Sequence, residues 1–134
     1  MFVIDASVIL KWFVEEEKGT KEALGIKQNH IEGKYTLVIP DIAIYEVGNA
    51  LRYKPDSLPR EVSRYCRNLY ELNLDIVAFP IEIIDLTIEI SFQNDITFYD
   101  ASYIALAKEL GLQFITADER LYNKTKHFHF VKLL

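Results

Sequence analysis

The chain has 134 residues and carries 20 acidic against 15 basic side chains, which gives a net charge of −5. This length is typical of one domain, so we expect a single domain over residues 1–134. The acidic balance argues against a protein that coats nucleic acids, and a hydrophobic content of 50% argues against disorder.

The chain has one cysteine, Cys66, so no disulfide can form within it and no C-x-x-C pair can hold structural zinc. No apolar run approaches the roughly 18 residues that span a bilayer. No basic segment precedes the first apolar residues, as it would in a signal peptide. We therefore expect a cytoplasmic protein that does not associate with membranes.

The hydrophobic pattern predicts strands that alternate with helices. The predicted strands are 2–5, 35–40, 74–80, 112–118 and 129–134, and the predicted helices are 7–14, 18–30, 41–53, 60–72, 81–93, 99–111 and 119–123. Ser7 and Asp41 are expected to cap the first and third helices, and Gly111 to end the sixth. Segment 81–93 also alternates like a strand, but its length and the preceding Pro80 favour a helix.

This alternation predicts an α/β fold, a single-domain α/β/α sandwich with a central, mainly parallel sheet. In such sheets, ligands bind beyond the carboxyl ends of the strands. Asp5 and Asp118 are each the last residue of a predicted strand, so both carboxylates are expected at that edge.

Two further acids stand in unusual surroundings. Glu46 lies on a predicted helix among mostly small and apolar neighbours, and Asp100 begins an alanine-rich helix, where capping is its alternative role. If these acids converge with Asp5 and Asp118, each pair about 4 Å apart repels by roughly 4 kcal/mol. Bound protons or a cation would relieve that repulsion. Mg²⁺ or Mn²⁺ suits a set of ligands that contains only oxygen.

Four stretches in this chain resemble the PIN-domain family, and in particular its VapC-type toxin ribonucleases. They are "VIDASVIL", "VIPDIAIYEVGNALR", "TFYDASYIALAKELG" and "QFITADERL", and they occur in the family's order over nearly the whole chain. The resemblance implies that Asp5, Glu46, Asp100 and Asp118 are catalytic metal ligands, with Ser7, Asn49 and Thr116 in support. Glu119 matches an additional acid of some relatives, but an exposed acid that begins a helix is equally expected.

The resemblance further implies an endoribonuclease that uses Mg²⁺ or Mn²⁺ to cut single-stranded or looped RNA. A metal-activated water would leave 5′-phosphate and 3′-hydroxyl ends. It also implies a homodimer that is inhibited by a VapB-type antitoxin. A PIN-domain RNA-processing nuclease outside a toxin system and a non-catalytic PIN scaffold are the alternatives. Phosphoacceptor regulators and haloacid-dehalogenase-like phosphatases fit the acid pattern less well.

The stretch from Arg52 to Arg67 contains five basic and two acidic side chains. It is either a solvated helix face or a strip that contacts phosphates, with Arg52 and Lys54 as candidate substrate-binding residues. For the aromatic and histidine side chains, a structural role is expected. We expect packing in the core or at an interface for Tyr45, Tyr53, Tyr65 and Tyr70. His127 and His129 are expected to lie on one face of the last strand, as packing or surface residues.

Overall fold

The computed structural model describes residues 1–15 and 18–134. It contains a five-stranded sheet in the order β3-β2-β1-β4-β5, and every neighbouring pair is parallel. The strands are β1 (Phe2–Ile4), β2 (Leu37–Pro40), β3 (Asp75–Val77), β4 (Gln113–Thr116) and β5 (Val131–Leu133). The predicted α/β fold with a parallel sheet is therefore confirmed.

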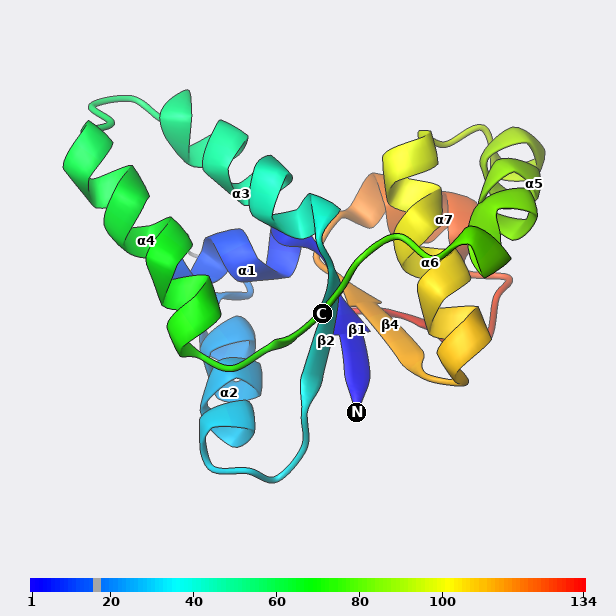
Figure 1. The fold of residues 1–134 in the computed structure, drawn as a ribbon, viewed down its shortest axis with the longest axis horizontal. Coiled ribbons are helices and arrows are strands. Elements are labelled where there is room, and N and C mark those ends of the chain that lie inside the picture. Colours follow the sequence, from blue (N-terminus) through cyan, green and yellow to red (C-terminus); the bar gives the residue numbers. More distant parts are fainter. Residues whose placement is uncertain (16–17) are drawn as a thin grey trace.

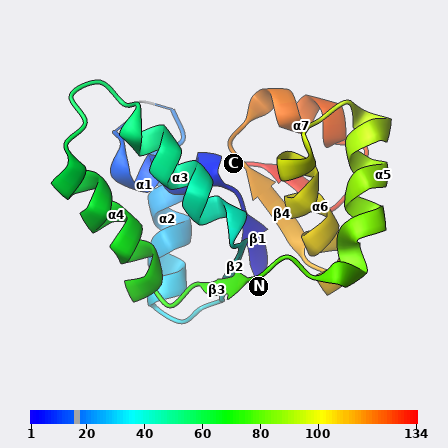
Figure 2. The same ribbon diagram turned by 45° about the horizontal axis from the view of Figure 1, so that its top comes forward.

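Helices cover both faces of this sheet (Figure 1). They are α1 (Ala6–Phe13), α2 (Thr20–Ile31), α3 (Ile42–Arg52), α4 (Pro59–Glu71), α5 (Ile84–Asn94), α6 (Phe98–Leu110) and α7 (Glu119–Thr125), with a 3₁₀ turn, η1, at Ile81–Ile83. Figures 1 and 2 show α1 to α4 on one side of the sheet and α5 and α6 on the other. None of the helices in the described residues is both long enough and apolar enough to cross a membrane.

The central strands consist of apolar residues because they are buried on both faces. Val3 and Ile4 of β1 are fully buried, and so is every residue of β2. On one face, α6 packs across β1, β2 and β4 with the small side chains of Ala101 and Ala105. On the other face, the indole Nε1 of Trp12 donates to the Ala23 carbonyl at 2.9 Å and ties α1 to α2.

Several helix ends differ from the prediction. Asp5, not Ser7, caps α1, because its carboxylate follows the strand directly and accepts from the backbone N–H groups of Ser7 and Val8. Asp41 takes the N-cap position of α3 in a helical conformation, where its side chain makes no capping hydrogen bond within the described residues. In α6 the cap is Thr97, not Asp100.

The remaining expectations divide. Segment 81–93 is helical as predicted, and Gly111 ends α6 at a φ of 66°, in the left-handed region that favours glycine. His127 and His129 lie in the turns before β5, so the prediction that they share one face of the last strand was wrong. Tyr45, Tyr53 and Tyr70 are not packed in the core, because their exposed fractions are 72%, 74% and 61%, so packing at an interface remains the expectation for these three tyrosines. Tyr65 is partly buried, with its ring stacked on Phe13 at 4.8 Å.

The contrast between Thr97 and Asp41 predicts unequal effects on stability. Thr97→Ala removes the hydrogen bond to the Asp100 N–H and is expected to lower the free energy of unfolding by about 1 kcal/mol. Asp41→Ala removes no such bond, so its effect should stay below about 0.5 kcal/mol. Urea unfolding of both variants measures the difference, and equal losses would contradict this assignment of the caps.

Candidate active site

The acidic site lies where the connections from the sheet diverge. β1 and β4 are neighbours at the centre of the sheet. From β1 the chain continues to β2 on one side, and from β4 it continues to β5 on the other side, so the two connections run in opposite directions. Asp5 follows β1 directly, and Asp118 comes two residues after β4. Such a switch point at the carboxyl ends of parallel strands is the usual ligand-binding position of this class of fold.

The other two predicted acids reach the same edge from helices. Glu46 stands in the second turn of α3, which begins immediately beyond the end of β2. Only Gly111 and Leu112 separate the end of α6 from the start of β4. The end of α6 therefore lies near the amino ends of the strands. The first turn of α6, which carries Asp100, lies at the other end of this helix, beside the carboxyl ends of the strands.

Asp5 is the most buried of the four acids, with an exposed fraction of 5%. Its Oδ1 accepts from the Ser7 hydroxyl at 2.5 Å and from the Ser7 N–H at 3.0 Å, and its Oδ2 accepts from the Thr116 hydroxyl at 2.5 Å. These hydroxyl oxygens accept in turn from the backbone N–H groups of Ala117 (2.8 Å) and Asp118 (3.1 Å). Ser7 and Thr116 thus join the end of β1 to the end of β4.

Burial is the largest influence on the ionisation of Asp5 and raises its pKa from 3.8 to about 7. The hydrogen bonds from Ser7, Thr116 and the Val8 N–H oppose this increase, because they stabilise the charged form. The nearby charge of Asp100 adds to it. Asp5 is therefore held in place by its partners and still resists ionisation when no cation is near.

Glu46 is oriented by a buried tyrosine. The Tyr103 hydroxyl donates to Glu46 Oε1 at 2.5 Å, and the Tyr103 ring is 1% exposed and stacks on Phe114 at 5.9 Å. Burial raises the pKa of Glu46, the Tyr103 hydrogen bond lowers it, and the charge of Asp100 raises it further. The tyrosine therefore fixes one carboxylate oxygen and leaves the other for a ligand.

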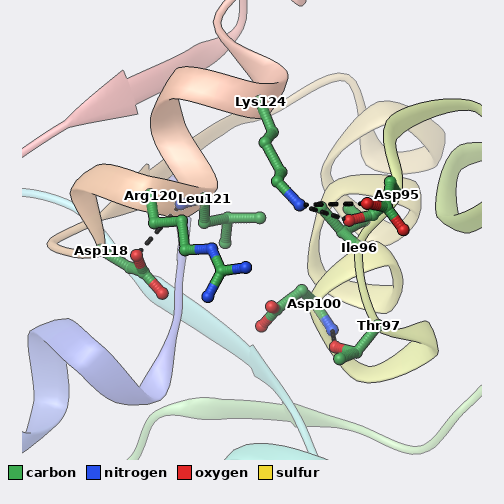
Figure 3. A pocket seen from close by; sticks show the side chains of 8 residues that line it. All are labelled: Asp95, Ile96, Thr97, Asp100, Asp118, Arg120, Leu121 and Lys124. Carbon is green, nitrogen blue, oxygen red and sulfur yellow. Dashed lines mark hydrogen bonds and ion pairs between the residues drawn. The ribbon is translucent and has the colours of Figure 1, made fainter.

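Asp100 and Asp118 face one another across a pocket of about 230 Å³ (Figure 3). Burial and the charge of Asp118 raise the pKa of Asp100, while the hydrogen bond with Thr97 lowers it. Asp118 also caps α7, because its Oδ1 accepts from the Leu121 N–H at 3.0 Å. Both acids are thus held at the first turn of a helix, where the helix dipole favours negative charge.

The charges of these acids act on one another, with Asp100 as the common member. Asp100 raises the pKa of Asp5 and of Glu46, and Asp118 raises that of Asp100. In residues 1–15 and 18–134, however, no three Asp, Glu, His or Cys side chains are gathered closely enough to hold a metal ion. The oxygen donors suit a hard divalent cation. Binding one would require the carboxylates to move closer or to coordinate through water.

Asn49 and the two candidate basic residues make no described contact with the acids. Asn49 is exposed on α3, one turn after Glu46, and the Arg52 guanidinium lies 5.0 Å from the centre of the Tyr53 ring. Lys54 is exposed just after α3, so neither basic residue is placed among the acids by a described contact. Glu119 forms an exposed ion pair with Lys18, which lowers the pKa of Glu119.

Two residues near the acids were not identified from the sequence. Tyr103 lies three residues after Asp100, within a stretch, 101–107, whose other side chains are small or aliphatic. A tyrosine in such an apolar stretch is expected to be buried, and a buried tyrosine hydroxyl normally has a hydrogen-bond partner, so the sequence did contain a signal for this residue. Arg120 lines the pocket with Asp100 and Asp118, and nothing in the sequence indicates the direction of its side chain.

Residues 2–126 match the family described as the PIN domain. The chain belongs to the PIN-domain family. It is 31% identical over 127 residues to a protein named Ribonuclease VapC3 from Pyrobaculum aerophilum, covering 91% of this chain and 92% of that one. A second PIN relative from this organism, named Exonuclease VapC9, is 33% identical over 97 residues, or 72% of each chain.

The fold of this chain also resembles that of a solved structure, a toxin-antitoxin complex from Klebsiella pneumoniae. The TM-score is 0.71 at 16% identity, with 98% of this chain and 96% of the other covered. At this identity, the likeness supports the fold alone.

The raised pKa of Asp5 predicts how the stability of the metal-free protein depends on pH. The folded state binds the Asp5 proton more tightly than the unfolded state, so the free energy of unfolding should fall as pH rises from about 4 to about 7. Asp5 contributes up to about 4 kcal/mol to this fall. Urea unfolding with a chelator should show a shallower decline for Asp5→Asn, and parallel curves would contradict the burial argument.

Proposed function

We propose that this protein is an endoribonuclease that depends on Mg²⁺ or Mn²⁺. The observation that carries the proposal is the placement of Asp5, Glu46, Asp100 and Asp118 at the carboxyl ends of the strands, at the switch point of the sheet, where Asp100 and Asp118 line one pocket. The family supports the same conclusion, because two PIN relatives at this level of identity are named as nucleases.

In this proposal, Asp5, Glu46, Asp100 and Asp118 would hold the metal through carboxylate oxygens, after moving closer together or through bridging water. The ion would supply Lewis-acid chemistry toward the scissile phosphate and a water molecule, so that no amino-acid nucleophile would be needed. The ion would also reverse the cost of ionising buried acids, because the positive charge favours the carboxylate form. The raised pKa values in the metal-free protein are therefore expected of a site that functions with a cation.

The residues around the acids have separate tasks in the proposed reaction. Ser7 and Thr116 orient both oxygens of Asp5, and Tyr103 orients Glu46. Asp100 lies at the open pocket opposite Asp118, and its backbone N–H is held by the Thr97 hydroxyl, so its carboxylate is available to the metal. Asn49 is proposed as a polar support on the same helix as Glu46.

The mode of cutting is a distinct part of the proposal. One relative is named a ribonuclease and the other an exonuclease, so their names leave internal cutting and cutting from an end both open. We favour internal cutting, because an acidic rim at an open sheet edge does not require a free RNA terminus to enter. Arg52 and Lys54 would contact the RNA farther along the strand.

Circular RNA separates these possibilities. With Mg²⁺, the wild-type protein should cut both linear and circular RNA, whereas an exonuclease would cut only the linear form. Asp100→Asn should reduce the rate at least 100-fold, because it removes the acid that links the other three. Asp95→Asn is the matched control. Asp95 lines the same pocket, but its side chain is exposed and ion-paired to Lys124, so the rate should stay within about twofold.

Equal cutting by the wild type and Asp100→Asn would reject the proposed site. Cutting that persists in a chelator would reject the metal. Failure of the wild type to cut any member of a panel of structured and unstructured RNAs would instead favour the non-catalytic PIN scaffold. Circular dichroism of each protein would show whether a loss of cutting results from unfolding and not from the change at the site.

We further propose that the protein is the cytoplasmic toxin of a toxin–antitoxin pair, that it forms a homodimer, and that a VapB-type antitoxin inhibits it. The VapC names of the relatives support this proposal, and the fold of a toxin-antitoxin complex is consistent with it. A basic side chain of the antitoxin could neutralise the acids in place of the metal. An RNA-processing role outside such a pair is the alternative.

Induced expression should separate the two cellular roles. If the protein is a toxin, the wild type should arrest the growth of a bacterial host, and Asp100→Asn should not. Co-expression of a DNA-binding protein encoded beside the gene should restore growth and co-purify with the wild type. Normal growth with a protein that is folded and active on RNA would favour RNA processing.

A further inference from the structure

The pocket beside Asp100 and Asp118 has a positively charged wall. Arg120 and Lys124 lie one helical turn apart on α7, and both line the pocket (Figure 3). They are the basic residues among those that line it in the described chain. A pocket at the acidic edge of the sheet therefore presents two cations to whatever enters it.

The two cations differ in what they contact. Lys124 donates to the backbone carbonyl of Asp95 at 2.7 Å and lies 3.6 Å from the Asp95 carboxylate, so it ties α7 to the end of α5. Arg120 is exposed, and no hydrogen bond or ion pair involving its side chain is found among residues 1–15 and 18–134. Figure 3 shows its guanidinium group between the carboxylates of Asp118 and Asp100.

We propose that Arg120 binds a phosphodiester group of the RNA beside the catalytic acids. The planar guanidinium can donate two parallel hydrogen bonds to the oxygens of one phosphate. It is the pocket cation that is free to do so, because Lys124 is already engaged with Asp95. This inference rests on the proposed function and adds to it a residue that contacts the substrate.

Electrostatics favour such a residue. The charges of the acids at this edge repel the phosphates of RNA, and a bound metal ion would offset only part of that repulsion. Arg52 lies six residues beyond Glu46 along α3, or about 9 Å along the helix axis, and its guanidinium lies over Tyr53. Arg120 lines the pocket together with two of the acids and is therefore better placed to hold the phosphate nearest the reaction.

RNA affinity with divalent ions removed by a chelator tests this inference without cleavage. Single-stranded RNA carrying a fluorophore is titrated with protein at several salt concentrations. Arg120→Gln should weaken binding about tenfold and reduce the slope of log affinity against log salt by about 0.7. Arg120→Lys should retain the slope but recover only part of the affinity, because an ammonium group lacks the paired donors.

Lys126→Gln is the matched control, because it removes one exposed positive charge at the end of the same helix but outside the pocket. It should bind RNA within about twofold of the wild type. With Mg²⁺, Arg120→Gln should also cut more slowly at low RNA concentration, and saturating RNA should recover part of the rate.

Unchanged affinity and slope in Arg120→Gln would overturn the inference. If that variant also bound Mg²⁺ more tightly, Arg120 would instead be an internal counter-ion of the acids. A wild type that bound RNA through Arg120 but never cut it would support the inference and reject the proposed catalysis. A wild type that neither bound nor cut RNA would reject both.

Discussion

The geometry of the site depends on one buried carboxylate. Asp5 is 5% exposed, and its two oxygens accept hydrogen bonds from the hydroxyls of Ser7 and Thr116. The same hydroxyls accept from the backbone just after β4, so the ends of the two central strands are linked through side chains. A carboxylate satisfied in this way can remain in a dry position, where an unpaired one would be strongly destabilising.

The other three acids are each held in position by a separate local hydrogen bond. Tyr103 holds Glu46, Thr97 stabilises the turn that carries Asp100, and Asp118 is fixed by its own capping bond to Leu121. The carboxylates of Glu46 and Asp118 therefore each accept one hydrogen bond, whereas Asp100 is held through its backbone. Burial of the carboxylates is the main cost of this arrangement and their mutual repulsion adds to it, so the pKa values of Asp5, Glu46 and Asp100 are raised.

The sequence was sufficient for the order of the elements and for the edge at which the acids lie. Strand-ending acids such as Asp5 and Asp118 are informative because parallel strands all present their carboxyl ends at one edge. The caps were harder, because an aspartate followed two residues later by a serine allows either residue to begin the helix. Only the backbone conformation at Asp5 decides between them.

Side-chain direction set the limit elsewhere. A tyrosine on an amphipathic helix can face the core or solvent, and one sequence did not separate the partly buried Tyr65 from the exposed Tyr70. Arg120 is a similar case, since its charge would be unfavourable near a helix start and gives no sign of a pocket. The degree to which the acids converge also depends on side-chain torsions, which hydrophobic periodicity does not report.

The separation between Thr97 and Asp100 has a consequence for how such a domain can evolve. Because the threonine caps the start of α6, Asp100 is not needed for the capping hydrogen bond there. If the proposed function holds, exchange of Asp100 for a neutral residue would abolish cleavage in a single step and leave the fold intact. Asp118 has no such freedom, since its loss would also loosen the helix that carries Arg120. Descendants that abandon catalysis are thus expected to lose the acid at position 100 before the one at position 118.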